Sequence, residues 1–213
     1  MSSRRLVVFA LAAAVVLSGC LTGQRPTLEQ AAVGGEPGTS TGDPAVDAVL
    51  VKLERSERVV FTAGYTITRA VGGVVTQASV TQDASRLSIT IGRVRFLDLG
   101  DQQTCKLDLG TCESGFLDAR VSDTGVQHAF YREAAARRLR VAVTRKTGPT
   151  VAHQEASIAG YPAVCVDVPL GAGAETYCSN DLDVVARWTA ADISVELTTL
   201  GPAASDDLFS VTG

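Results

Sequence analysis

The residues of this sequence best suited to chemistry are its five cysteines, and the first of them stands apart from the others. Cys20 ends the segment Leu17-Ser18-Gly19-Cys20, where an uncharged apolar run over residues 6–17 stops. Arg4 and Arg5 precede that run. It is too short for the ~20 residues of a membrane-spanning helix and has the length of the apolar part of an export signal. Residues 1–19 are therefore predicted to be a signal peptide.

The position of Cys20 gives its thiol a specific chemical role. Leucine, a small residue, glycine and cysteine in this order resemble the lipobox of bacterial lipoproteins, in which the cysteine sulfur takes a diacylglyceryl group. The signal is then cut between Gly19 and Cys20. Two or three acyl chains, at ~0.8 kcal/mol for each buried methylene, hold a protein stably on a bilayer. We therefore expect a lipid anchor on the extracytoplasmic face of the cell membrane. The alternatives are ordinary secretory cleavage, in which Cys20 is not modified, and a twin-arginine signal.

Four further cysteines remain in the exported chain. They are Cys105, Cys112, Cys165 and Cys178. An even number in an exported protein favours disulfides, and three pairings exist for four cysteines. We predict the two local disulfides Cys105–Cys112 and Cys165–Cys178, because each pair flanks a short glycine-containing segment that can reverse the chain. The spacing lacks C-x-x-C and only His128 and His153 could assist, so no metal site is predicted.

No catalytic motif is present in the sequence. G-x-S-x-G, H-E-x-x-H and the Walker loop are all absent. His128 lies near Tyr131 and Glu133 without a nucleophile, which favours a helix-surface or half-buried histidine over a general base. The sequence therefore predicts neither an enzyme nor a bound cofactor.

The charge of the exported chain limits its partners. Loss of residues 1–19 removes two arginines and leaves 17 basic against 23 acidic side chains, a net charge of about −6. A body this acidic is a poor candidate for nucleic acid or for adsorption to anionic lipid. Four arginines make a local basic face; they are Arg132, Arg137, Arg138 and Arg140. We predict that this is a solvated helix face. The alternative is that it contacts an anionic head group or an acidic partner.

Composition divides the exported chain into a tether and one domain. Residues 20–42 are rich in Gly, Pro and Thr without a sustained period, which predicts a lipidated flexible tether. Residues 43–213 are predicted to form a single α+β domain.

Two helices and a set of strands are expected within that domain. Asp43-Pro44 is a helix start signal, and apolar residues then recur at helical spacing to near Ser56. A second helix is expected between residues 125 and 148, whose part 141–144 could equally be extended. Period-two alternation begins at residue 61 and predicts about eight strands, each with one apolar face. This pattern predicts a curved antiparallel sheet, a half-barrel, packed over two helices.

The last third of the chain adds a family resemblance. The segments "IAGYPAVCVDVP" (158–169) and "ETYCSNDLDVVARWTAADISVELTTL" (175–200), after a helix, a strand meander and a helix, resemble actinobacterial lipoproteins with the LolA-like fold of lipoprotein carriers. The resemblance implies a half-barrel that can enclose acyl chains.

Two apolar stripes are the candidate lining of such a cavity. They are Phe61, Tyr65, Ile67, Ile193, Val195 and Leu197. The same stripes could instead pack directly on the helices, since burying each side chain contributes ~1.5–3 kcal/mol with or without a ligand. We predict a non-enzymatic, lipid-anchored envelope protein that binds or carries a lipid or another apolar ligand. The alternative is an accessory module with a solid core that contacts another envelope protein.

Overall fold

The structure, a computed structural model, describes residues 35–171 and 173–210. The predicted signal peptide, the lipobox with Gly19 and Cys20, and the first part of the predicted tether lie outside the described residues. The described end of the tether is held against the first helix, because the backbone N–H and hydroxyl of Thr41 donate to Asp47 Oδ1 at 2.8 and 2.7 Å.

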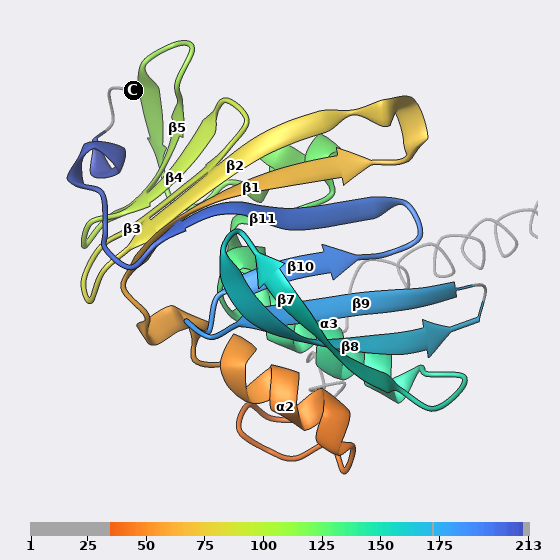
Figure 1. The fold of residues 1–213 in the computed structure, drawn as a ribbon. Coiled ribbons are helices and arrows are strands. Elements are labelled where there is room, and N and C mark those ends of the chain that lie inside the picture. Colours follow the sequence, from red (N-terminus) through yellow and green to blue (C-terminus); the bar gives the residue numbers. More distant parts are fainter. Residues whose placement is uncertain (1–34, 172, 211–213) are drawn as a thin grey trace, which may run out of the picture. The chain divides into compact units, whose positions relative to one another are not determined.

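The described strands form one antiparallel sheet of 11 strands in the order β6-β5-β4-β3-β2-β1-β11-β10-β9-β8-β7 (Figure 1). The strands are β1 Phe61–Arg69, β2 Val75–Gln82, β3 Leu87–Ile91, β4 Val94–Asp98, β5 Gln102–Lys106, β6 Thr111–Ser114, β7 Val151–Ile158, β8 Tyr161–Leu170, β9 Gly173–Asn180, β10 Val185–Thr189 and β11 Ile193–Gly201. Two meanders of consecutive strands thus meet at the pair β1–β11. The predicted curved α+β half-barrel is confirmed.

The β1–β11 pair is irregular at Gly64, where the register shifts by one residue. A Cβ at this position would lie 2.6 Å from Thr199 Oγ1, closer than any real side chain could sit. Glycine therefore permits the close approach of the two strands at a bulge, and bulges bend the sheet.

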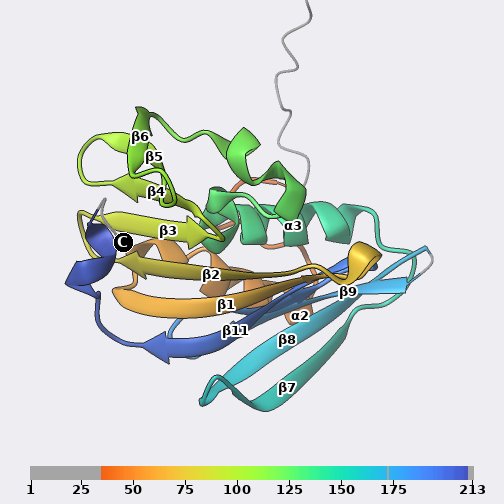
Figure 2. The ribbon, with the colours of Figure 1, turned by 90° about the horizontal axis from the view of Figure 1, so that it is seen from above.

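Two helices, α2 (Pro44–Leu53) and α3 (Glu133–Thr144), cover one face of the sheet (Figure 2). Asp43 caps α2 by accepting a hydrogen bond from the Ala45 N–H at 3.2 Å. The apolar positions of α2 are all buried; they are Val46, Val49, Leu50 and Leu53. The first helix ends three residues earlier than predicted. Residues 141–144, which the sequence left undecided, belong to α3.

The two predicted disulfides are confirmed and both join neighbouring strands. Cys105–Cys112 links β5 to β6, and Cys165–Cys178 links β8 to β9. Each cysteine faces its partner directly in the strand register. Closing such short loops contributes about 2–4 kcal/mol by restricting the unfolded chain.

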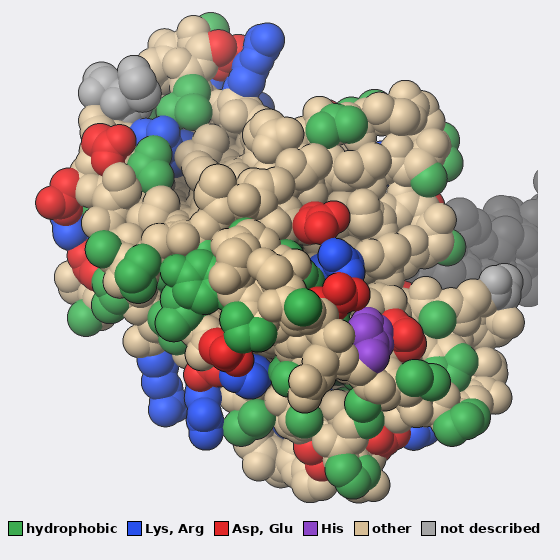
Figure 3. Space-filling view, in the orientation of Figure 1, with side chains coloured by type: hydrophobic (Ala, Val, Ile, Leu, Met, Phe, Trp, Pro, Cys, Tyr) green, Lys and Arg blue, Asp and Glu red, His purple; other side chains and the backbone are tan. Residues whose placement is uncertain are grey.

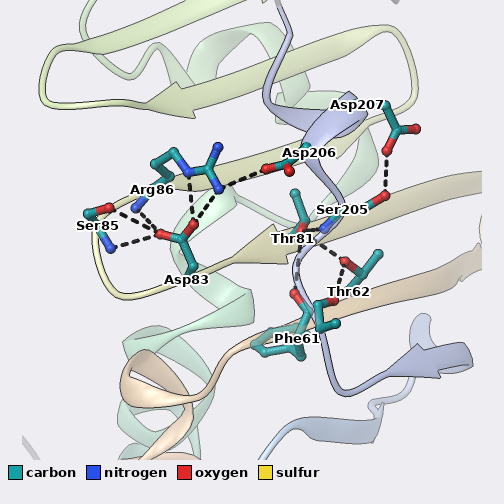
Figure 4. A network of polar contacts seen from close by, with 10 residues as sticks. Phe61, Thr62, Thr81, Asp83, Ser85, Arg86, Ser205, Asp206 and Asp207 are labelled. Carbon is teal, nitrogen blue, oxygen red and sulfur yellow. Dashed lines mark hydrogen bonds and ion pairs between the residues drawn. The ribbon is translucent and has the colours of Figure 1, made fainter.

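The described end of the chain folds back over the other face of the sheet (Figure 4). The Ser205 N–H donates to Thr81 Oγ1 on β2 at 3.0 Å. The Arg86 guanidinium pairs with Asp206 at 2.9 Å and lies 4.1 Å from the ring centroid of buried Phe209. This segment therefore covers the convex side of β2 and β3.

Asp83 holds Arg86 in place for that contact. Its carboxylate accepts the Ser85 N–H at 2.9 Å and the Arg86 Nε–H at 2.8 Å. The Ser85 N–H and then the Arg86 side chain lower the pKa of Asp83 to about 2. The stabilisation is thus present above the ordinary aspartate pKa and is lost as the pH falls through about 2.

The predicted solvated basic face is wrong for Arg140, and Arg132 lies just before α3 with its Nε buried. The side chain of Arg140 is only 5% exposed and donates to Glu54 Oε1 through Nη2 at 2.6 Å and through Nε at 2.9 Å. Nη2 also donates to the Thr39 carbonyl at 2.9 Å. Arg140 therefore joins α3, the end of α2 and the tether.

Among residues 35–171 and 173–210, none of the helices combines the length and the apolar character that a bilayer crossing requires.

We predict that Arg140→Ala destabilises the protein by about 3 kcal/mol, because it leaves Glu54 partly buried without its counter-charge. Urea unfolding measures this. Arg137→Ala is the matched control, since the side chain of Arg137 is 64% exposed and only reaches Glu133 at 3.8 Å. Its cost should stay below about 0.5 kcal/mol. Equal losses for both variants would contradict the assignment of Arg140 as the interhelical link.

Candidate binding groove

The six residues predicted to line a cavity lie together on the concave face. Phe61, Tyr65 and Ile67 come from β1, and the other three, Ile193, Val195 and Leu197, come from β11. Tyr65 pairs with Leu197 in the strand register. All six are buried and belong to one apolar cluster with residues of α2 and α3. The structure brings them together as core, and their ligand-binding role stays a prediction.

Two tyrosines meet in that core. The rings of Tyr65 and Tyr131 are 4.8 Å apart, and neither hydroxyl has a hydrogen-bond partner among the described residues. Burial, together with the Tyr131 hydroxyl nearby, raises the pKa of Tyr65 well above its usual value, and burial does the same to Tyr131. Each unsatisfied buried hydroxyl costs roughly 1–3 kcal/mol. The concave face thus carries a polar pair within an otherwise apolar packing.

A groove of about 260 Å³ opens at one end of the sheet, beside the turn between β10 and β11. It is lined by Arg69, Gly125, Arg138, Glu175, Trp188, Ala190, Asp192 and Ile193. These residues come from β1, α3, β9, β10, β11, the turn between β10 and β11, and the loop before the short helix His128–Tyr131. The groove is therefore assembled from both meanders of the sheet and from one helix.

Main-chain bonds between neighbouring turns set the shape of the groove. Arg69, the last residue of β1, pairs with Ile193 at the start of β11, and the Ala70 N–H donates to the Asp192 carbonyl at 2.9 Å. Gly125 has a φ of +75°, and a Cβ there would lie 3.0 Å from Ile193 Cδ1. Glycine is thus the residue that lets this loop approach the end of β11.

Trp188 forms the aromatic part of the groove. It is 4% exposed and pairs with Tyr177 across β10 and β9. The Arg138 guanidinium lies 4.8 Å from the Trp188 ring centroid, within the range of a cation–π contact. The Trp188 Nε1–H donates to Glu175 Oε2 at 3.4 Å, and the Tyr177 hydroxyl donates to the same oxygen. Burial first, and the Glu175 carboxylate second, raise the pKa of Tyr177.

The two arginines of the groove keep unused hydrogen-bond donors. Arg69 donates from Nη1 to the Asp123 carbonyl at 2.7 Å. Arg138 has ring contacts with Phe130 and Trp188, and within the described residues no carboxylate lies within 4 Å of either guanidinium. A guanidinium presents five N–H donors in a planar fork that matches a carboxylate. The groove therefore has the chemistry of a binding site for a polar or anionic group.

The two histidines lie away from the groove. His128 Nδ1 is 2.7 Å from Asp118 Oδ1, and its ring packs against Phe96 and Phe116, which makes it a half-buried structural histidine. It lies in the short helix before α3 and not in α3 itself.

His153 lies on β7 opposite Cys165 of β8. Acidic and basic side chains are interspersed on the face of the molecule that Figure 3 shows. One of the ring nitrogens of His153 and the sulfurs of Cys165 and Cys178 lie within 4.8 Å of one another. These sulfurs are joined in a disulfide, so they offer no thiolate to a metal ion.

The sequence interpretation missed most of the groove. Arg69 and Glu175 carry no local signal, because their neighbours are set by the register of strands far apart in the chain. The alternation around Trp188 predicts a strand and does not predict the groove. Trp188 being the single tryptophan of the chain was the one available hint.

No family model matches the sequence, and the search of curated proteins finds no relative. Solved structures with a similar fold include three of MucB. The crystal structure of MucB has a TM-score of 0.51 at 14% identity, over 79% of this chain and 63% of that chain. The structure of MucB in complex with MucA(peri) has a TM-score of 0.46 at 13% identity, over 78% of this chain and 58% of that chain. The complex structure of Pseudomonas aeruginosa MucA/MucB has a TM-score of 0.49 at 14% identity, over 78% of this chain and 60% of that chain.

The likeness to MucB concerns the fold. The chain spans less than two thirds of the length of these structures. Within that span the LolA-like half-barrel that the sequence resemblance implied is confirmed. The actinobacterial lipoprotein part of the resemblance stays a prediction.

We predict that Glu175→Leu destabilises the protein by about 2 kcal/mol, because the buried donors of Tyr177 and Trp188 lose their acceptor. Tyr177→Phe should cost less than about 1 kcal/mol, since it removes a donor and leaves Glu175 partly solvated. Urea unfolding followed by Trp188 fluorescence measures both. A larger loss for Tyr177→Phe than for Glu175→Leu would contradict the role given to Glu175.

Proposed function

We propose that this protein is a non-enzymatic, lipid-anchored accessory module of the cell envelope that binds another envelope protein. The observation that carries the proposal is the filled concave face. Side chains of the sheet, α2 and α3 form one buried cluster where a carrier would need an open cavity.

The size and lining of the groove support lipid carriage less well than protein binding. Pockets for drug-sized ligands measure about 300–1,000 Å³ and are mostly apolar. The groove has about 260 Å³ and is lined by four charged side chains. An acyl chain could enter the half-barrel only if the helices moved off the sheet and exposed that cluster. Lipid or apolar-ligand carriage is therefore the second candidate, supported by the resemblance to carrier folds.

Protein binding has two further supports. The groove combines a tryptophan with two arginines, the residue types that dominate the binding energy of protein interfaces. MucB, whose fold this chain shares, has been solved in complex with MucA(peri), so a protein partner is a known use of such a half-barrel.

The anchor and the location rest on the sequence. The lipobox at Cys20 supports attachment to the outer face of the cell membrane, and the acidic body makes electrostatic adsorption a poor substitute for it. The segment that follows Cys20 supports a body able to stand off from the bilayer.

Native mass spectrometry of the exported protein and photo-crosslinking in intact cells test the function together. We expect a mass without bound lipid beyond the anchor, and one recurrent protein adduct from a photoreactive residue at Ala190, which lines the groove. The same residue at Val151 on β7, which is exposed outside the groove, is the matched control. A stoichiometric non-covalent lipid with no protein adduct would favour the carrier instead.

The anchor has its own test. We expect Cys20→Ala to block lipidation and cleavage before residue 20, because the alanine side chain has no sulfur to accept the diacylglyceryl group. Metabolic labelling with a fatty-acid analogue and detergent phase partitioning measure this. Acylation equal to that of the wild type would refute the anchor, whereas Cys105→Ala should leave labelling unchanged.

A further inference from the structure

We propose that the groove recognises an extended segment of its protein partner in which one carboxylate is flanked by apolar side chains. The carboxylate binds Arg138 and Arg69, and an apolar neighbour contacts the tip of the β1–β2 hairpin. This inference rests on the proposed function, because it names the chemistry of the partner at the same site.

Arg138 is held ready for such a group. Its guanidinium is stacked over Trp188 at 4.8 Å, so its orientation is fixed before a partner arrives. Fixing a guanidinium in advance lowers the entropy lost when it binds a carboxylate. Its hydrogen-bond donors are not used by any described residue, and the stacked face still leaves the edge of the fork open for in-plane hydrogen bonds.

The two acidic residues of the groove limit what can bind. Glu175 already accepts hydrogen bonds from Tyr177 and Trp188, while exposed Asp192 at the rim has no ion pair with a described residue. Two arginines against two carboxylates make the groove nearly neutral in sum. A polyanion would therefore be repelled by Asp192, but a single carboxylate placed beside Arg138 would be accepted. The volume of about 260 Å³ is of the size of one or two side chains.

An apolar surface adjoins the groove. Val71, Val74 and Val75 at the tip of the β1–β2 hairpin are 73%, 52% and 58% exposed. The Val74 carbonyl accepts the Arg69 N–H at 2.9 Å, so the tip continues directly from the wall of the groove. Three exposed β-branched residues within five positions form a patch that a partner can bury. This places an apolar contact next to the charged one.

An extended peptide fits this arrangement better than an anionic bilayer. A bilayer presents many negative charges at once, and both Asp192 and the net charge of about −6 of the exported chain oppose it. A short segment brings one charge and its apolar neighbours together.

Trp188 makes the test direct, because it is the only tryptophan of the chain and it lies in the groove. The exported protein is titrated with acetyl-Val-Leu-Asp-Leu-Val-amide and with the same peptide carrying Asn for Asp, and Trp188 fluorescence is followed. We expect saturable binding of the Asp peptide and at least about tenfold weaker binding of the Asn peptide, since a charge-assisted pair is lost.

Matched arginine variants assign the effect. Arg138→Gln and Arg69→Gln should each weaken binding of the Asp peptide about tenfold or more. Arg137→Gln should leave it unchanged, because that neighbouring side chain faces solvent and pairs with Glu133. Urea unfolding of each variant separates a loss of binding from a loss of folding, and Arg69→Lys, which keeps the charge, should retain part of the affinity.

Several results would overturn the inference. They are equal binding of both peptides, wild-type binding by folded Arg138→Gln, absence of binding by either peptide, or Arg138-dependent binding of phosphatidylglycerol vesicles with none of the peptide. A protein adduct at Ala190 together with any of these results would retain the proposed function while removing the acidic segment as its ligand. Loss of that adduct with intact peptide binding would remove the proposed function and retain the acidic segment as a ligand of the groove.

Discussion

The pairing of β1 with β11 is the contact on which the other features depend. It joins a strand that begins at Phe61 to one that ends at Gly201, and so closes two separate meanders into a single sheet. Long-range pairing of this kind costs loop-closure entropy before its hydrogen bonds contribute. The concave face on one side, the C-terminal segment on the other and the groove at the end of the pair all follow from its register. Gly64 makes the register possible, because a larger residue would collide with Thr199.

A sheet with one apolar face must bury that face, and here the protein itself supplies the cover. α2 and α3 fill the concave side, and the pair of Arg140 with Glu54 ties their ends together. In a carrier of the same architecture a ligand would replace part of this packing. The hydroxyls of Tyr65 and Tyr131 have no hydrogen-bond partner among the described residues, but they lie within the cluster and do not open it.

The sequence predicted those features whose cause is local. The alternation from residue 61, the Asp43-Pro44 start signal and the glycine-containing segments between paired cysteines each act within about ten residues, and the corresponding strands, helix and disulfides are present. The alternation does not predict strands β5, β6 and β7, because their residues are mostly polar and β6 and β7 lie at the edges of the sheet with mostly exposed side chains. Arg140 was misjudged because its burial depends on Glu54 and Thr39, which no helical period reveals. The groove could not be predicted either, since it requires the strand register.

The modest chemistry of the groove is consistent with the proposed location. One carboxylate and an apolar contact give weak binding in free solution, because association must first overcome the loss of translational and rotational freedom. Two proteins held at the same membrane surface meet at an effective concentration that reaches the millimolar range for short flexible linkers. A nearly neutral site then has an advantage over a strongly basic one, because it does not adhere to anionic head groups that are present at far higher density. The balance of two arginines against Glu175 and Asp192 is thus consistent with the proposed binding of a protein segment close to a bilayer.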